Sequence, residues 1–422
     1  MLKQKEKTIY NAVIITMNSN YDIIENGYIS IKNNKITSIG KGKPKNTENL
    51  YNAKGSIIIP GFVNAHTHLP MTMYRGIADD LPLKEWLEEH IWPAEAKNTN
   101  EKNVRSAAKL GLEEMIRTGT TTFCDMYFFA DAVAEETSEI GLRAVMNEPI
   151  IDFATNSYKN TAEALKKALD FIEKWGNNNL IYPALNFHST YSCNKKTLSE
   201  IKKISDKYNI GVSTHLSETQ QEVKTVTQQQ NATPAQYLNN LGLLTNKTIA
   251  AHCVWLTKHE QKLFAETGAN IVHCPTSNLK LGSGIAPIAQ YIEKGINVAL
   301  GTDGCASNNN LNMVEEMRLA ALIHKGTNHN PTLIPARKAL KMATINGAKA
   351  LGLDDKIGSI ETGKHADLLL IDTNNTFMKP IYDYYSAVIY SMNSSCISTV
   401  LVDGKVLMEN KTINQANELI HQ

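Results

Sequence analysis

Apolar residues follow two alternating spacings over most of the chain. From residue 101 onward, stretches with apolar side chains every three or four positions predict helices, and short β-branched runs between them predict buried strands. The predicted helices cover Glu101–Thr118, Ala130–Ile140, Ala162–Trp175, Thr197–Tyr208, Thr233–Leu241, His259–Thr267, Pro287–Lys294, Asn310–Lys325 and Ile334–Leu351. The predicted strands cover Gly119–Asp125, Arg143–Val145, Ile181–Phe187, Gly211–His215, Thr248–His252, Asn270–His273 and Val298–Thr302.

This strand–helix repeat indicates an α/β fold. Repeated roughly eight times, it is the pattern of a (β/α)8 barrel, also called a TIM barrel. A doubly wound parallel sheet has a similar alternation and is the second interpretation. Doubly wound sheets that bind dinucleotides carry Gly-x-Gly-x-x-Gly after their first strand, and this motif is missing from the sequence. The barrel is therefore the predicted fold.

Both ends of the chain predict β-structure instead. Ile9–Thr16 is apolar and β-branched, and Ala366–Asp372 and Thr399–Leu407 have the same character near the other end. The economical interpretation is a small composite β-sandwich, built from both termini, that packs against the barrel. We expect residues 1–58 and 356–422 to form this sandwich and residues 59–355 to form the metal-dependent barrel hydrolase domain.

Composition narrows the class of partner. Of the 422 residues, 42% are hydrophobic and 20% are charged, and the formal net charge is +1. Such a balance gives no long-range field toward nucleic acid or an acidic membrane surface, so we expect neither partner. The charged start and the lack of a long apolar run predict no signal peptide and no transmembrane helix. Six unpaired-looking cysteines are typical of a cytoplasmic protein.

Metal-ligating residue types follow the predicted strands. In a barrel, the C-terminal ends of the strands form the face where chemistry takes place. The residues at these ends are His66, His68, His188, His215, His252 and Asp303. His66 and His68 are two positions apart, so on a strand their side chains point to the same side. This convergence indicates a metal-dependent site.

A catalytic metal site needs a few protein ligands and one position for water. His66, His68, His215 and Asp303 are sufficient ligands. Zinc is the expected ion, with Fe²⁺ or another divalent metal as alternatives. The strand that ends at His188 carries no lysine to bridge two ions, so we expect one metal per subunit.

The same residues suggest a hydrolytic reaction. A divalent metal makes water acidic enough to act as a nucleophile near neutral pH. We expect Asp303 to take the proton and Glu218, three residues after His215, to transfer a proton to the substrate. His252 is expected to orient the water by a hydrogen bond. The target would be a planar carbon–heteroatom centre or a carbonyl.

The sequence resembles the amidohydrolase superfamily, and within it the branch of 5-methylthioadenosine/S-adenosylhomocysteine deaminases and related chlorohydrolases. The resemblance extends over nearly the whole chain. The motifs that carry it are Pro60–His68, Gly119–Thr121, His215–Thr219, Ala251–Cys253, Ser277–Gly284, Gly301–Asn309 and Gly358–Asp367. Together these motifs are more specific for the branch than for the substrate.

The resemblance implies a zinc-dependent aminohydrolase that acts on C6 of an adenine ring. Glu218 would protonate N1, and ammonia would leave. It also implies that Glu95 holds the ribose hydroxyls, that His188 binds substrate and that Trp86 packs against the nucleoside. The enzyme would be a homo-oligomer that takes a small nucleoside substrate. Candidate substrates are 5′-methylthioadenosine, S-adenosylhomocysteine, 5′-deoxyadenosine and adenosine.

Two departures from the family pattern bear on the substrate. Thr190 stands where a proline is usual in Phe187–Tyr191, and Glu148 stands where we expect an arginine that contacts the substrate tail. An acid at that contact would repel the carboxylate of S-adenosylhomocysteine. The alternatives are a triazine hydrolase or chlorohydrolase and a deaminase of a free base such as guanine or cytosine. A third is a non-catalytic relative, which the complete ligand set argues against.

Overall fold

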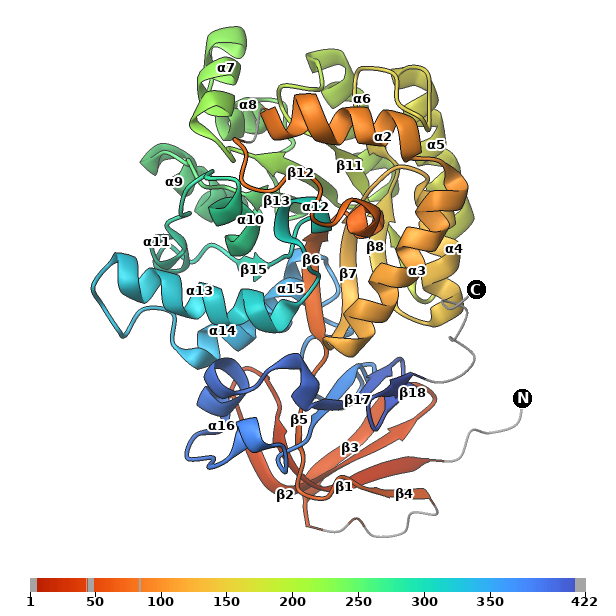
Figure 1. Cartoon of the computed structure of the whole chain (residues 1–422), viewed down its shortest axis with the longest axis vertical. Coiled ribbons are helices and arrows are strands. Elements are labelled where there is room, and N and C mark those ends of the chain that lie inside the picture. The colour runs from red at the N-terminus through yellow and green to blue at the C-terminus, as the bar shows by residue number, and fades with distance from the viewer. Residues whose placement is uncertain (1–5, 43, 45–48, 83–84, 414–422) are drawn as a thin grey trace.

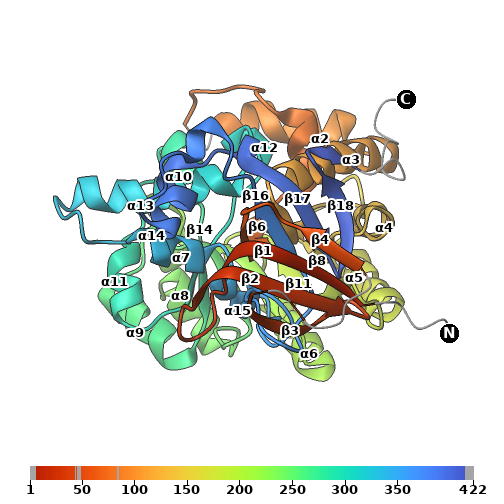
Figure 2. The same ribbon diagram turned by 90° about the horizontal axis from the view of Figure 1, so that it is seen from below.

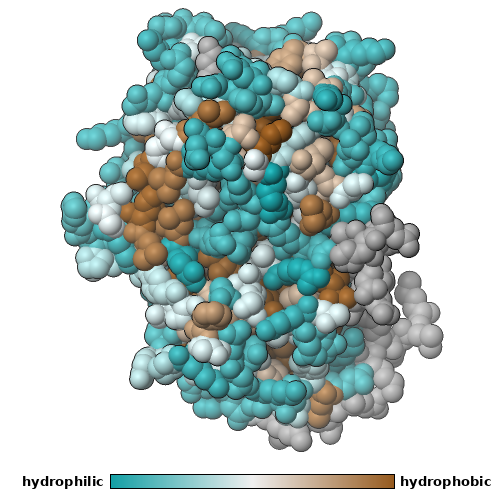
Figure 3. All heavy atoms as spheres, in the orientation of Figure 1, coloured by the Kyte–Doolittle hydropathy of each residue, from teal (hydrophilic) through white to brown (hydrophobic). Residues whose placement is uncertain are grey.

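A computed structural model describes residues 6–413 except 43, 45–48 and 83–84. The described chain has an upper part with an inner ring of strands surrounded by helices, and a lower part dominated by strands (Figure 1). Most of the face drawn in Figure 3 is hydrophilic, with a hydrophobic patch over α11 and α13. None of the described helices is long and apolar enough to cross a membrane.

The inner ring consists of parallel strands in chain order. Their bounds are β6 Phe62–Thr67, β7 Thr120–Met126, β8 Arg143–Asn147, β9 Pro149–Ile150, β10 Ile181–Pro183, β11 Leu185–Phe187, β12 Val212–Leu216, β13 Thr248–His252, β14 Asn270–His273 and β15 Val298–Leu300. One run of neighbours is β10-β8-β7-β6, and the other is β15-β14-β13-β12-β11-β9. Ala184 separates β10 from β11, which pair with opposite neighbours.

The first and last strands of the ring meet at a close backbone contact. The amide of Asp303 donates to the carbonyl oxygen of His66 at 3.0 Å. Gly301 lies so near β6 that an added Cβ would come within 2.8 Å of the same carbonyl oxygen, so only glycine fits there. This contact closes the ring and brings two predicted metal ligands together. The (β/α)8 alternation expected from the sequence is thus found.

Helices cover the outside of the ring. They are α2 Trp92–Asn98, α3 Glu101–Arg117, α4 Ala130–Ile140, α5 Thr161–Trp175, α6 Lys195–Tyr208, α7 Gln220–Gln230, α8 Pro234–Asn240, α9 Lys258–Thr267, α10 Pro275–Lys280, α11 Ile288–Glu293, α12 Cys305–Asn308, α13 Met313–Thr327, α14 Ala336–Met342 and α15 Ile345–Ala350. Short turns of other helix types precede α2, namely η1 Leu69–Tyr74 and η2 Trp86–Ile91. Asn side chains cap several of these helices, as at Asn100 before α3.

One predicted helix is divided in two. The sequence predicts a single helix over Ile334–Leu351, but the structure has α14 and α15 with a break at Ala343 and Thr344. The carbonyl oxygen of Ala343 accepts a hydrogen bond from the amide of Val63 in β6 at 2.8 Å. The break therefore anchors the final helices to the first barrel strand.

Strands from both ends of the chain form one nine-stranded sheet. Its strands are β1 Lys7–Ile15, β2 Ile23–Lys32, β3 Lys35–Lys41, β4 Asn49–Asn52, β5 Ile57–Pro60, β16 Leu368–Ile371, β17 Ile397–Val402, β18 Lys405–Glu409 and β19 Thr412–Ile413. The order is β19-β18-β17-β16-β5-β1-β2-β3, with β4 beside β1. The antiparallel pair β5–β16 joins the two ends, and Figure 2 shows the sheet from below. The expected two-layer sandwich stays a prediction.

Short helical segments between β16 and β17 complete this part of the chain. They are η3 Thr376–Met378, α16 Tyr384–Ser386, η4 Ala387–Ser391 and η5 Ser394–Cys396. A buried ion pair then connects the sheet to the barrel, because Arg143 Nε of β8 lies 3.0 Å from Asp367 Oδ2. The barrel and the sheet therefore share a charged contact at the N-terminal ends of the barrel strands.

Candidate metal and substrate site

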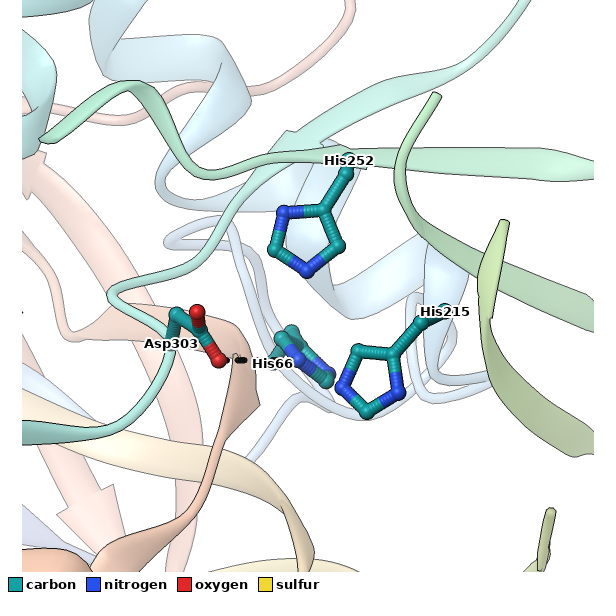
Figure 4. A group of neighbouring side chains, drawn as sticks. All are labelled: His66, His215, His252 and Asp303. Carbon is teal, nitrogen blue, oxygen red and sulfur yellow. Dashed lines mark ion pairs between the residues drawn. The ribbon is translucent and has the colours of Figure 1, made fainter. Parts of the chain in front are cut away.

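Four buried side chains converge at the C-terminal ends of the barrel strands (Figure 4). They are His66 of β6, His215 of β12, His252 of β13 and Asp303 after β15, and each offers one ligand atom within 4.8 Å of the others. His68 Nε2 adjoins the group, 3.1 Å from Asp303 Oδ1 and 3.1 Å from His215 Nε2. The structure therefore brings together every residue that the sequence analysis assigned to the metal, and adds His252.

Backbone and amide acceptors orient the imidazoles. His68 Nδ1 lies 2.6 Å from the carbonyl oxygen of Met126, and His215 Nδ1 lies 2.7 Å from that of His188. A carbonyl oxygen can only accept, so each Nδ1 carries a proton, and in the neutral ring Nε2 presents its lone pair to the cluster. His252 Nδ1 makes a similar contact of 2.8 Å with Asn278 Oδ1.

The carboxylate of Asp303 is held in place by two serines. Ser277 Oγ donates to Asp303 Oδ2 at 2.7 Å, and Ser307 Oγ donates to the same oxygen at 2.8 Å. The other oxygen, Oδ1, faces the histidines, 3.4 Å from His66 Nε2. One oxygen is thus anchored by the protein, while the other is directed at the cluster.

The donor set fits a divalent metal. Neither ring nitrogen of His66 makes a hydrogen bond to any described residue, although this side chain is 1% exposed. Buried polar atoms normally make hydrogen bonds, so a buried imidazole whose nitrogens make none calls for a ligand. Imidazole nitrogens with one carboxylate are the ligands of catalytic zinc and of several other first-row metals.

Burial and mutual contact set the protonation of the cluster in the absence of a cation. Burial alone would raise the pKa of Asp303, but the hydrogen bonds with His66 and His68 lower it. The net result is a pKa well below the usual value for an aspartate. Burial alone would lower the pKa of His68, but the hydrogen bond and charge of Asp303 raise it to about 9. Burial lowers the pKa of His66 to about 4. Asp303 is therefore a carboxylate, which suits a cation.

Glu218 lies at the edge of the same cluster. Ser283 Oγ donates to Glu218 Oε1 at 3.1 Å, and His252 Nε2 lies 4.0 Å from Glu218 Oε2. Its backbone is fixed by Glu222, whose carboxylate accepts from the amides of Ser217 at 2.9 Å and Glu218 at 2.7 Å. The sequence analysis missed Glu222. Its position in the first turn of a helix, four residues after Glu218, is the signal that would have revealed it.

The backbone around the site adopts uncommon conformations. Ser217, His252, Cys253 and Asp303 all have positive φ angles, between 47° and 69°. Non-glycine residues avoid this left-handed region, and such strain is concentrated at functional sites. Each of these residues lies at or just after the end of a strand that carries a candidate ligand. The strained turns therefore belong to the same site as the side chains.

A cavity of about 970 Å³ opens onto the cluster and contains most of the predicted substrate contacts. Its lining includes His68, Trp86, Glu95, His188, His215, Glu218, His252 and Asp303. Tyr127 donates its hydroxyl to Glu95 Oε1 at 2.7 Å, and burial raises the pKa of that glutamate. His188 Nδ1 lies 3.2 Å from the hydroxyls of Ser189 and Ser192.

Glu148 is the predicted substrate contact that the structure does not bring to the cavity. Its carboxylate lies at the start of α4, where it accepts hydrogen bonds from the amides of Phe129 at 3.3 Å and Ala130 at 2.9 Å. It is 4% exposed and is not among the residues that line the cavity. Glu148 caps a helix, so the expected repulsion of a substrate carboxylate by this residue has no basis in the geometry.

The fold and site define a class of protein. A barrel that gathers histidines, an aspartate and a neighbouring glutamate at the C-terminal ends of its strands is a hydrolytic enzyme that works with a divalent metal. The comparison with known families agrees, because residues 57–407 match the amidohydrolase family. The chain belongs to the amidohydrolase family, as the sequence analysis expected.

Several similar proteins within the family are named as deaminases of adenosine or its derivatives. The chain is 43% identical over 403 residues to the 5-methylthioadenosine/S-adenosylhomocysteine deaminase of Thermodesulfovibrio yellowstonii, covering 94% of this chain and 92% of that protein. It is 44% identical to the 5′-deoxyadenosine deaminase of Methanocaldococcus jannaschii, covering 92% and 93%. A zinc-bound adenosine deaminase structure from Xanthomonas campestris has a TM-score of 0.94 at 35% identity, covering 97% and 94%.

Proposed function

We propose that this enzyme is a hydrolytic deaminase of 5′-substituted adenosines. The observation that carries the proposal is that Glu218, at the edge of the buried His/Asp cluster, shares one cavity with Glu95. An acid–base group beside the cluster suits deamination, and a second carboxylate suits the ribose hydroxyls. Relatives named for 5-methylthioadenosine, S-adenosylhomocysteine and 5′-deoxyadenosine support the same substrate class.

We assign one zinc ion per subunit to His66, His68, His215 and Asp303. When bound, the ion would supply the Lewis acidity that makes water nucleophilic near neutral pH. The unpartnered nitrogens of His66 and the lone pairs of His68 and His215 support this assignment. His252 belongs to the same group of possible ligands. We assign it to orienting the water, because its Nε2 faces Glu218 at 4.0 Å.

The proton transfers fall to two carboxylates. Water adds to C6 of the adenine ring, Asp303 accepts a proton, and Glu218 donates one to N1. The C6–N bond then breaks as the amino nitrogen takes the proton held by Asp303 and the C6 hydroxyl returns a proton to Glu218, so that ammonia leaves and a carbonyl forms at C6. The product is the inosine analogue. Glu222 and Ser283 hold Glu218 for this task through the hydrogen bonds described above.

The rest of the nucleoside would occupy the part of the cavity that Glu95, His188 and Trp86 line. Glu95, partly buried beside Tyr127, is assigned to the ribose hydroxyls. His188 is assigned to the substrate, and the ring of Trp86, 5% exposed, to packing against the nucleoside. Burying a carboxylate without a cation is costly, and a diol that donates two hydrogen bonds would offset that cost.

Triazine or free-base hydrolysis is the alternative within the family. A structure of atrazine chlorohydrolase from Arthrobacter aurescens has a TM-score of 0.92 at 25% identity, covering 97% of this chain and 96% of that one. A triazine or a free base has no ribose diol for Glu95. Glu95→Gln should therefore raise KM for a nucleoside but leave KM for a free base or a triazine unchanged.

The direct experiment is ammonia release from the zinc-loaded enzyme. The panel is 5′-methylthioadenosine, 5′-deoxyadenosine, adenosine, S-adenosylhomocysteine, guanine and a chlorotriazine. Turnover of the nucleosides supports the proposal. Turnover of guanine or the triazine alone would contradict it while leaving the metal chemistry intact.

Three finer assignments belong with this proposal. We propose that residues 1–58 and 356–422 form a composite β-sandwich domain beside the barrel domain of residues 59–355, which the mixed nine-stranded sheet supports. We also expect a homo-oligomer, because the resembling enzymes are oligomeric, and a cytoplasmic location, because all six cysteines are free and buried.

A further inference from the structure

The opening of the cavity has a distinct character. With the adenine at the cluster and the ribose at Glu95, the 5′ substituent would face the remaining wall. That wall is aromatic, with Trp92 and Phe153 at a ring-centroid distance of 6.5 Å and Phe128 nearby. Trp92 is 40% exposed and Phe153 is 51% exposed, so these rings lie where the cavity opens to solvent.

Apart from histidines, the described charged residues that line the cavity are all acids, and Asp152 is the one next to Phe153. Among the described residues that line the cavity, none is lysine or arginine, whereas Asp152, Glu95, Glu218 and Asp303 are acids. Asp152 accepts hydrogen bonds from the hydroxyls of Thr161 and Thr197 at 2.9 and 2.6 Å. A substituent that ends in a carboxylate would therefore meet a carboxylate and aromatic rings but no described cation.

Two described cations, Lys280 and Arg143, and the side-chain amide of Asn156 make their contacts elsewhere. Lys280, which precedes the lining residue Leu281, pairs with Asp79 at 2.5 Å. Arg143 begins β8, the strand that ends directly before Glu148, and it is buried against Asp367 at the opposite end of the barrel. The amide of Asn156 donates to the carbonyl oxygens of Glu95, Ala96 and Thr99. None of these groups is available to receive a carboxylate.

We propose that this wall selects adenosines whose 5′ substituent is uncharged and apolar and discriminates against a substituent that ends in a carboxylate. The inference rests on the proposed deaminase function and narrows its substrate class. It separates the substrates for which the relatives are named, since 5′-deoxyadenosine and 5′-methylthioadenosine lack the carboxylate that S-adenosylhomocysteine carries. Phe153 and Trp92 are the specificity-determining residues.

A matched pair of substrates isolates the charge. 5′-S-butylthioadenosine and 5′-S-(3-carboxypropyl)thioadenosine differ only in the terminal methyl or carboxylate group. We expect kcat/KM for ammonia release to be at least about tenfold higher for the butyl compound, because an unpaired carboxylate is left without partners in the cavity. Equal values, or a preference for the carboxylate, would overturn the inference.

The two proposals fail in different ways. If the enzyme deaminates adenosine and both analogues equally well, the proposed function survives and the selectivity does not. If no nucleoside on the panel releases ammonia, the proposed function is wrong and the selectivity falls with it.

A substitution at the exposed ring tests the location. Phe153→Arg supplies a cation on the aromatic wall, and Phe153→Met is the matched neutral control. Relative to Phe153→Met, we expect Phe153→Arg to raise the ratio of kcat/KM for the carboxypropyl over the butyl compound by about tenfold, with less effect at high salt. An identical ratio in the two variants would show that this wall does not face the 5′ substituent. Thermal melting checks that both variants fold.

Discussion

The barrel buries a polar cluster at each end, and the two are opposites. At the end that faces the sheet, Arg143 donates to both oxygens of Asp367 at 3.0 and 3.2 Å, and the amide of Asp403 donates to Asp367 at 2.7 Å. At the other end, His66 has no hydrogen-bond partner in the described chain. The first cluster is satisfied by the protein itself, whereas the second needs something from outside.

This difference separates a structural cluster from a binding cluster. A buried ion pair whose hydrogen bonds are complete holds two parts of a fold in register, and removing one partner leaves an uncompensated charge. A buried group of ligand atoms whose hydrogen bonds are incomplete costs free energy until a cation occupies it. Substitutions at the sheet end should therefore change stability, and substitutions at the site end should change metal content and rate.

The largest effect should come from His66→Ala. Loss of this ligand should reduce the bound zinc per chain to a small fraction and should abolish deamination. Elemental analysis after gel filtration measures the zinc. His259→Ala, at an exposed position of α9, is the control and should keep its zinc. Unchanged zinc in His66→Ala would refute the assigned ligand.

Arg143→Met should disrupt the buried ion pair at the end of the barrel that faces the sheet. We expect the free energy of unfolding to fall by about 3–5 kcal/mol, because Asp367 would stay buried without its cation. Denaturant unfolding measures this change. Lys262→Met is the control, since its pair with Glu266 at 3.5 Å is exposed and should be worth about 1 kcal/mol or less. Zinc content per folded chain should be the same in both variants.

Glu218→Gln should separate rate from binding. The amide cannot transfer the proton, so kcat should fall at least about a hundredfold, while zinc content and melting temperature stay unchanged. Steady-state ammonia release gives the rate. Glu293→Gln, on an exposed position of α11, serves as the control. Near-full turnover by Glu218→Gln would exclude its role as the acid–base group.

The smallest effect should be an acid-sensitive loss of stability from a second histidine pair. His273 and His324 are each 1% exposed, with ring centroids 5.4 Å apart. Burial, and then the charge of Lys325, lowers the pKa of His324 to about 4. The unfolded chain, with an ordinary histidine pKa near 6.5, therefore binds the proton first as pH falls.

The sign of the pH effect follows directly. Stability should be full above about pH 6.5 and should decline toward pH 4 by roughly 1–3 kcal/mol. Unfolding by denaturant at a series of pH values measures the decline. His324→Met should make it shallower, and His329→Gln, at an exposed position, should leave it in place. An unchanged slope in His324→Met would place the acid sensitivity elsewhere.

Local spacing was enough to predict much of the molecule. The alternation of strand and helix patterns predicted the barrel, and histidines at strand ends predicted the candidate ligands that the structure gathers. These predictions work because side-chain direction on a strand repeats every two residues, so the face of each ligand is determined locally. The family followed from the same motifs and is confirmed by the match over residues 57–407.

Other features depend on neighbours that are remote in sequence, which spacing does not reveal. Glu148 sits between two short strands, and only the packing of α4 against them decides that its carboxylate caps a helix instead of reaching the cavity. The pairing of Arg143 with Asp367 joins residues far apart in the chain. The 5′ wall lacks a described cation for the same reason. The sequence by itself determined which way each ligand points along its own strand, but ring closure and helix packing alone decided which groups meet.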